Sequence, residues 1–412
     1  MGIIMDAAMY WGMTKIKPKP VTVRDERVFG TMNIHRNFVI FGGAGGSLNE
    51  RKSIEALNSK IFLCHRHRHP IVILTSDQLW ANRLFRTFPD ITAFGMNAGY
   101  QPFGCNGDRS VSKYMTDGIV EMYRASGLMN NGFGQHSDMN RDYLNEFITI
   151  LFNVLERNYG ARGLTYQHLR TMANAIFNTG GINGFVKWLR RYGCSIDDNS
   201  IQALNRIWSN HLTAIRTFWE TMENQFAPYT SNRFIGHSTN IYSALRRNRM
   251  ILFYVRNISS DMLRAAIFRD ISMVGSNPFP YCIIDHNVPF ASNELHNIFA
   301  PNGNRSVEFG MYFTAFNRFN ADISSISAVL DDIICVGARN AGDAESIASQ
   351  FRYMVYRWMP HIDRHGIGAA KAAVPNIEAN LLLAGKNGVP DGCAYVFNNK
   401  GLQYLHSYNY IS

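Results

Sequence analysis

Short apolar runs that lack polar alternation recur along this chain, and helical patterns separate them. Strands buried on both faces of a sheet have this character, because neither face exposes side chains to water. The order strand, helix, strand favours an α/β fold with a mostly parallel sheet. The expected strands are Phe38–Phe41, Ile71–Thr75, Ile91–Phe94, Met250–Val255, Tyr281–Ile284, Gly310–Ala315, Ile333–Val336 and Ala394–Phe397. The expected helices are Ile54–Phe62, Gln78–Phe85, Arg141–Tyr159, Ser260–Val274, Ile323–Leu330 and Asp343–Trp358.

The middle of the chain has a different pattern, which is helical with glycine-containing breaks. Leu144, Phe147 and Leu151 recur there at the spacing of a helix that packs on a core. This change in pattern predicts an all-helical insertion within a single α/β domain. The predicted division is an N-terminal arm, 1–34, an α/β core, 35–111 and 226–412, and a helical insertion, 112–225.

Composition limits the classes of function. Lysine and arginine number 41 against 31 aspartates and glutamates, which gives a net charge of +10. Such an excess favours contact with nucleic acid or an acidic membrane surface, although a solvated basic surface has the same composition. The six cysteines form no paired motif, so neither a zinc site nor a disulfide framework is expected. A cytoplasmic location is expected instead. No apolar run reaches the length of about 20 residues that spans a bilayer.

A glycine-rich turn follows the first expected strand and precedes a helix. It contains Gly42, Gly43, Gly45, Gly46 and Ser47. Phosphate-binding loops have this arrangement, because glycines let backbone N–H groups approach phosphate and a helix N-terminus attracts anions. We therefore predict that these residues contact the phosphates of a nucleotide. A turn that binds no ligand is the alternative.

The basic and hydroxyl residues of the usual phosphate-loop pattern arrive late. That pattern ends in Gly-Lys-Ser/Thr, but here the lysine position falls on Leu48 and the hydroxyl position on Asn49. Lys52 and Ser53 follow one helical turn later. Either a longer loop delivers Lys52 to the phosphate, with Ser53 beside it, or the loop has lost the lysine that balances phosphate charge, and hydrolysis with it.

Two further strands end in polar residues. Tyr281–Ile284 leads into Asp285 and His286, and the carboxylate at the strand end could hold Mg²⁺. An aspartate that caps the following turn is the alternative. The strand Gly310–Ala315 leads towards Asn317, whose amide could sense a phosphate as such residues do in nucleotide pumps. An ordinary polar strand end near a loop is the alternative.

A run of three alternating histidines, His65, His67 and His69, precedes the strand Ile71–Thr75. On a strand, alternation would place all three on one face, where they could bind a transition metal. No carboxylate or cysteine cluster accompanies them, so a basic surface loop is the favoured interpretation.

The order of these segments resembles that of the FtsK/HerA class of P-loop pumps, which includes the coupling ATPases of type IV secretion and conjugation. The resemblance begins at His35 and covers most of the chain. After the glycine turn come a second strand at Ile71–Thr75, a helical insertion, an acidic strand end at Asp285 and a polar strand end at Asn317. It implies a RecA/FtsK-like P-loop core that uses ATP and Mg²⁺.

The resemblance also implies roles for single residues, and some diagnostic residues differ. Asp285 would hold Mg²⁺, and His286 stands where the family usually has a glutamate that polarises water. Asn317 stands where a glutamine senses the γ-phosphate. With Leu48 in the lysine position, these differences predict that hydrolysis is weakened or lost, and they leave open whether the chain is an ATPase.

The resulting hypothesis is a pump-like protein of the coupling or translocation type that acts on nucleic acid or a secretion substrate. Members of the class work as homo-oligomeric rings, so a ring or a large assembly with a peripheral membrane partner is expected. The alternative is a non-enzymatic structural or assembly subunit that binds nucleic acid. The basic excess and the incomplete motifs favour that alternative.

Overall fold

The computed structural model describes much of the chain, and its residues divide between two compact units. The first unit comprises 1–69, 282–300 and 307–412, and the second comprises 70–281 and 301–306. The residues that the structure describes are 21–24, 35–43, 45–100, 116, 119–120, 137–159, 166–231, 241–247, 250–254, 261–274, 281–289, 307–319, 329–350, 356–363, 366–373, 377–398 and 401–406.

The first unit is built on a mixed sheet whose centre is parallel. Its strands follow the order β1-β12-β11-β8-β2-β7-β6. The pairs β2–β7 and β2–β8 are parallel, whereas β11 pairs antiparallel with both β8 and β12. The strands are β1 (Val21–Arg24), β2 (Phe38–Phe41), β6 (Tyr281–His286), β7 (Val307–Phe313), β8 (Asp332–Cys335), β11 (Ala394–Asn398) and β12 (Gly401–His406).

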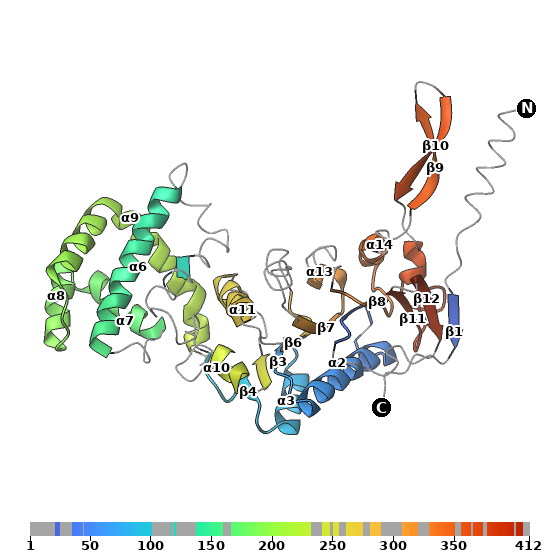
Figure 1. Ribbon diagram of the computed structural model, residues 1–412, viewed down its shortest axis with the longest axis horizontal. Helices are drawn as coiled ribbons and strands as arrows, with labels where there is room; N and C mark the ends of the chain where they lie inside the picture. The colour runs from blue at the N-terminus through green and yellow to red at the C-terminus, as the bar shows by residue number, and fades with distance from the viewer. Residues whose placement is uncertain are drawn as a thin grey trace, which may run out of the picture. The chain divides into compact units, whose positions relative to one another are not determined.

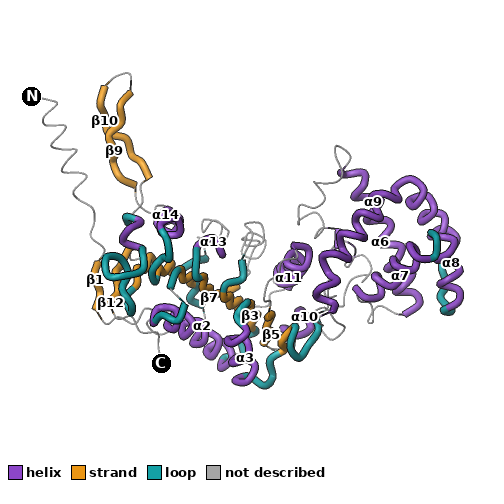
Figure 2. The backbone as a smooth tube through the Cα atoms, turned by 180° about the vertical axis from the view of Figure 1, so that it is seen from behind, coloured by secondary structure: helices purple, strands orange, loops and turns teal. Residues whose placement is uncertain are grey.

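Helices cover both faces of this sheet. In Figures 1 and 2, α2 lies along one face, and α13 and α14 lie on the other. Strands β2, β6, β7 and β8 are buried along their whole length, which explains why most of their residues are apolar on both faces. The remaining elements of the unit are α2 (Leu48–Arg66), α13 (Phe316–Phe319), α14 (Ala341–Gln350), the 3₁₀ turn η5 (Ala379–Leu382) and the antiparallel hairpin β9 (Tyr356–Asp363) and β10 (Gly366–Ala373).

The second unit combines a short parallel sheet with a group of helices. Strand β5 pairs in parallel with β3 and with β4. The strands are β3 (Ile71–Thr75), β4 (Thr92–Phe94) and β5 (Met250–Tyr254). The helices are α3 (Gln78–Thr87), α6 (Ser137–Tyr159), α7 (Tyr166–Asn178), α8 (Ile182–Arg191), α9 (Asp198–Ser231), α10 (Ile241–Arg246) and α11 (Asp261–Val274). Helices α6, α7 and α8, which lie in the range predicted as a helical insertion, belong to this unit.

The prediction of an α/β fold with a mostly parallel sheet is confirmed. Two predicted elements differ. The helix predicted over Asp343–Trp358 is wrong at its end, because α14 stops at Gln350 and Trp358 belongs to β9, which pairs with β10. Val21–Arg24, placed in the N-terminal arm, forms a strand beside β12. Most of the predicted helix Ile323–Leu330 lies outside the described residues.

None of the helices in the described part of the chain combines the length and the apolar content needed to cross a bilayer. The start of an individual helix is set by local signals in the sequence. Asp77 begins α3, for example, by accepting hydrogen bonds from the N–H groups of Leu79 and Trp80, at 2.7 and 3.1 Å.

Candidate phosphate-binding site

The glycine turn leaves β2 in a conformation that only glycine adopts easily. Gly42 and Gly43 have φ angles of +99° and +88°. The Gly42 N–H donates to Phe313 O at 2.9 Å, and the Gly43 N–H donates to Gly337 O at 2.8 Å. A Cβ atom on Gly42 would lie 2.3 Å from Gly337 O. The turn is therefore fixed between the ends of β7 and β8.

The second half of the turn begins α2, as the sequence predicts. Gly45 and Gly46 are exposed, and Gly46 has a φ of +80°. Ser47 caps the helix, because its hydroxyl accepts a hydrogen bond from the Glu50 N–H at 3.1 Å. The Glu50 carboxylate in turn accepts a short hydrogen bond from the Gly46 N–H. An anionic oxygen of the protein itself thus lies at the turn.

The residue in the hydroxyl position of the pattern, Asn49, joins α2 to later parts of the chain. Its amide nitrogen donates to Val336 O at 2.8 Å and to Pro390 O at 3.2 Å, and its oxygen accepts from the Gly392 N–H at 2.7 Å. Ser53 is also buried, and its hydroxyl donates to Asn49 O at 2.8 Å. Ser53 could bind a phosphate through its hydroxyl only if this hydrogen bond to Asn49 O were broken.

Lys52 lies in the second turn of α2 and is half-buried. Burial lowers the pKa of its ammonium group, although the nearby Glu55 and Cys393 act in the opposite direction. The side chain is therefore close to the start of β11. Its predicted contact with phosphate stays a prediction.

Asp285, the second-last residue of β6, has one carboxyl oxygen that lacks a hydrogen-bond partner among the described residues. The side chain is fully buried, and Oδ1 accepts a hydrogen bond from the Val288 N–H at 3.0 Å. Among the described residues, Oδ2 has no hydrogen-bond partner. Burial raises the pKa of this carboxyl well above its usual range, and the Val288 N–H offsets only part of that rise. Burial thus disfavours the charged form of this carboxyl, and a cation bound beside it would favour that form.

His286 is linked to the glycine turn through an aromatic ring. It is buried, and its imidazole stacks on Tyr312 with ring centroids 5.5 Å apart. The Tyr312 hydroxyl lies 3.2 Å from the position that a Cβ atom on Gly43 would take. The predicted residues Gly43 and His286 thus both lie next to one tyrosine, Gly43 near its hydroxyl and His286 against its ring.

Asn317 lies beyond the end of β7, as the second residue of α13, and it is exposed. The amide that joins the ends of β6 and β7 is a different one, Asn287. Its side-chain oxygen accepts hydrogen bonds from the N–H and the hydroxyl of Thr314, at 2.7 and 3.1 Å. The role of Asn317 as a phosphate sensor stays a prediction.

Sequence reasoning missed two charged residues at the turn. Arg339 follows β8, is exposed, and donates from Nε to Gly43 O at 3.1 Å. Glu50 binds the Gly46 N–H, as described above. Glu50 was detectable, because Ser-x-x-Glu before a helix is a capping signal. For Arg339, the only signal in the sequence was a basic residue shortly after a predicted strand. The carboxyl end of that strand lies beside the glycine turn.

These residues fit a nucleotide with Mg²⁺ in part. The first N–H groups of α2 have no partners within the helix and suit phosphate oxygens. Mg²⁺ is commonly held by one or two carboxylates together with phosphates of the substrate, and Asp285 offers such an oxygen. Within the described ranges, no group of three or more histidine, cysteine or acidic side chains is arranged to hold a metal ion by itself.

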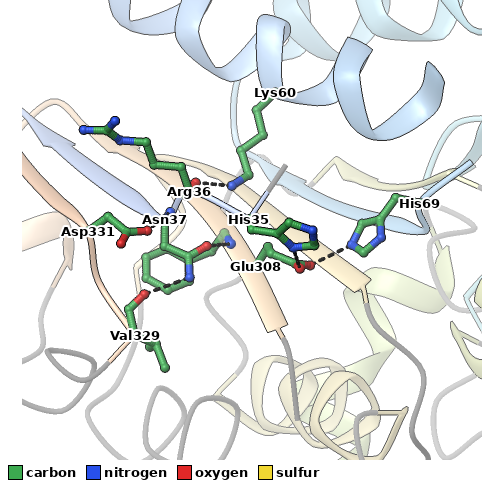
Figure 3. Close-up of polar contacts among 9 residues, drawn as sticks. His35, Arg36, Asn37, Lys60, His69, Glu308, Val329 and Asp331 are labelled. Carbon is green, nitrogen blue, oxygen red and sulfur yellow. Dashed lines mark hydrogen bonds and ion pairs between the residues drawn. The ribbon is translucent and has the colours of Figure 1, made fainter. Parts of the chain in front are cut away.

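The opposite end of the central strands, where β2 and β7 begin, carries a buried ion-pair cluster, which Figure 3 shows. Glu308, on β7, has a side chain that is 3% exposed. Its two oxygens contact His35 Nδ1 and His69 Nε2, each at 2.7 Å. Burial alone would raise the pKa of Glu308, but the two histidines lower it overall. For His69, burial lowers the pKa, and Glu308 more than reverses this, so the pKa is raised.

Other polar residues tie the strand starts together beside this cluster. Asn37 donates to Val329 O at 2.7 Å and accepts from the Phe309 N–H at 2.8 Å. The buried Lys60 ammonium donates to Arg36 O (Figure 3). These contacts therefore hold β2 and α2 together at the end of the sheet opposite the glycine turn.

The histidine run has a structural role in part. His65 lies in the last turn of α2, His67 ends the helix, and both are exposed. Only His69 turns inward, where it binds Glu308. The run forms no strand, because the helix continues to Arg66 and Arg68 then takes a φ of +53°. The alternation that suggested one strand face is therefore a coincidence of sequence.

The raised pKa of His69 predicts a pH-dependent stability. A protonated His69 stabilises the folded state fully below its usual pKa of about 6.5, and this contribution is lost as the pH rises through the raised folded-state pKa. We expect His69→Gln to lower the midpoint of thermal unfolding more at pH 6 than at pH 8.5, as measured by calorimetry. The exposed neighbour His65, changed to Gln, should show no such difference. Equal losses for His69→Gln at both pH values would contradict the assignment.

Comparisons with known proteins give little further information. No protein-family model matches the chain, and no curated protein matches it. Among solved structures, it is similar to VirB4 of Thermoanaerobacter pseudethanolicus, with 10% sequence identity, a TM-score of 0.45, and coverage of 90% of this chain and 88% of that one. A TM-score of this size establishes no common fold, so the case for a function rests on the residues of this chain.

Proposed function

We propose that this chain is a nucleotide-binding protein of the P-loop pump type, with hydrolysis weakened or lost. Its role would be in the translocation of nucleic acid or a secretion substrate, as part of a ring or a larger assembly. ATP with Mg²⁺ is the expected ligand. The glycine turn would receive the phosphates, and Asp285 would hold the metal ion.

One observation carries this proposal: a glycine turn and a buried carboxyl, of which one oxygen has no partner among the described residues, lie at the same end of a set of parallel strands. Ligands of open α/β sheets bind outside the carboxyl ends of the strands, and this turn lies at such an end, after β2. Asp285 is the second-last residue of β6, which is separated from β2 only by β7. A buried carboxyl with a free oxygen and a raised pKa costs stability, and such groups cluster at functional sites.

The alternative is a non-enzymatic assembly subunit, and specific contacts favour it. Asn49 and Ser53 are engaged in structural hydrogen bonds, and Leu48 stands in the lysine position. In this alternative the turn only shapes the start of α2. Large assemblies in light scattering that do not respond to nucleotide would favour it.

The role of Asp285 is tested by the dependence of nucleotide binding on Mg²⁺. We expect the anisotropy of a fluorescent ATP analogue to show binding about tenfold tighter with Mg²⁺ than with EDTA, which is the factor for about 1.4 kcal/mol. Asp285→Asn should remove this difference, because an amide is a weaker ligand for a hard cation than a carboxylate.

Asp343→Asn is the matched control for this variant. Asp343 is another buried carboxyl at the same edge, but its oxygens accept from the Phe316 N–H at 3.2 Å and from the Asn340 amide at 3.0 Å. It should keep the response to Mg²⁺. A response that survives in Asp285→Asn, or no binding of the analogue at all, would reject the proposal.

A further inference from the structure

The glycine turn already holds an anion that belongs to the protein. In a capping box, the glutamate at the third helical position reaches back to the N–H of the capping residue. Here Glu50 reaches one residue further and accepts from the Gly46 N–H, while Ser47 caps the Glu50 N–H. A phosphate that binds at Gly46 therefore has to displace a carboxylate.

The turn also has a cation that the phosphate-loop pattern does not contain. Arg339 Nε is fixed on Gly43 O at 3.1 Å, and the rest of its guanidinium group forms no ion pair with a described residue. The backbone before it is rigidly bound: Gly337 O accepts from Gly43, and Ala338 exchanges hydrogen bonds with Leu382 and Ala384 at 2.7 and 2.9 Å. A guanidinium presents several N–H donors and suits phosphate.

A separate observation also indicates a ligand at this edge. Asp285 is fully buried, and its Oδ2 lacks a hydrogen-bond partner among the described residues. The turn and β6 are connected through Tyr312, whose hydroxyl approaches Gly43 and whose ring stacks on His286. This end of the sheet thus combines a cation, backbone donors and a carboxyl with one oxygen that no described residue satisfies.

We propose that Glu50 is an internal competitor for the phosphate of the nucleotide and that Arg339 is the cation that binds this phosphate in place of the missing lysine. This inference rests on the proposed function. Glu50 holds the turn in its binding conformation without ligand and keeps affinity low. The incoming phosphate takes the Gly46 N–H from Glu50 and pairs with the Arg339 guanidinium.

The experiment is a titration of the full chain with Mg²⁺ and a fluorescent ATP analogue, followed by anisotropy. Glu50→Gln keeps the size of the side chain but removes the charge that competes with phosphate, so the analogue should bind about tenfold more tightly. Arg339→Ala should weaken binding about tenfold or more, and Arg339→Lys should recover much of the loss.

Matched controls separate local effects from general charge. Glu55→Gln removes the same charge from an exposed residue of α2, and Arg86→Ala removes a cation from α3; both should leave affinity within about twofold. Equal tightening in Glu50→Gln and Glu55→Gln, or wild-type affinity in Arg339→Ala, would overturn this inference and leave the proposed function standing. No binding by any variant, Glu50→Gln included, would overturn both.

Discussion

Replacing Gly42 with alanine is expected to destabilise the first unit by about 4 kcal/mol or more, or to prevent its folding. The new Cβ atom would lie 2.3 Å from Gly337 O, and the φ of +99° is strained for any residue with a side chain. Gly42 follows β2 and Gly337 follows β8, so neither backbone segment can move away without disturbing the sheet. The measurement is the urea dependence of thiol labelling at Cys335, a buried residue of β8.

The other glycines of the turn are graded controls for this prediction. A Cβ atom on Gly46 meets nothing within 4 Å, but its φ is +80°, so Gly46→Ala should cost only about 1–2 kcal/mol. Gly45 has open space and no positive φ, so Gly45→Ala should change stability by less than about 0.5 kcal/mol. A similar small loss for all three variants would show that the turn is not held between β7 and β8.

Replacing Glu308 with glutamine is expected to cost about 3–5 kcal/mol at pH 6, which is the usual loss when one partner of a buried ion pair is removed. The glutamine has a similar shape, but it leaves the buried His69 without its counter-charge. A smaller fraction of His69 is protonated at pH 8.5 than at pH 6. The counter-charge of Glu308 then matters less, so the loss should be smaller. Urea unfolding followed through Cys335 at both pH values is the measurement.

His35→Ala is the control for the Glu308 variant. The His35 side chain also contacts Glu308 but is 63% exposed, so water screens the pair and the loss should be about 1 kcal/mol or less. If His35→Ala costs as much as Glu308→Gln, the buried His69–Glu308 contact is not the main interaction. A loss for Glu308→Gln that is the same at pH 6 and pH 8.5 would lead to the same conclusion.

Much of the parallel sheet could be predicted from the sequence because its signal is local. Strands buried on both faces have uninterrupted apolar residues, and Phe38–Phe41 and Ile71–Thr75 were predicted with the bounds that the structure has. The end of α14 was missed because Trp358 is compatible with a helix and with a strand, and only pairing with β10 selects the strand. The same holds for β1, which depends on β12 at the other end of the chain.

The candidate site was predictable only in its backbone. Glycines after a strand indicate a turn, and the structure confirms the turn and the helix that follows it. The partners of Asn49 lie 287 to 343 residues away in the chain, so no local pattern could reveal that it clamps α2. Arg339 reaches the turn for a similar reason, since parallel strands bring distant ends together. Glu308 carried a visible signal, as an acid inside an apolar strand.

The most direct test of the central claim is amide hydrogen exchange, measured by mass spectrometry, with and without Mg²⁺ and ATP. Binding at the turn predicts slower exchange in peptides that cover 42–50, because phosphate oxygens would accept hydrogen bonds from N–H groups at the exposed start of α2. Peptides of the edge that contains Glu308 should not change. Saturable nucleotide binding without any change at 42–50 would contradict the claim that the glycine turn is the phosphate-binding site.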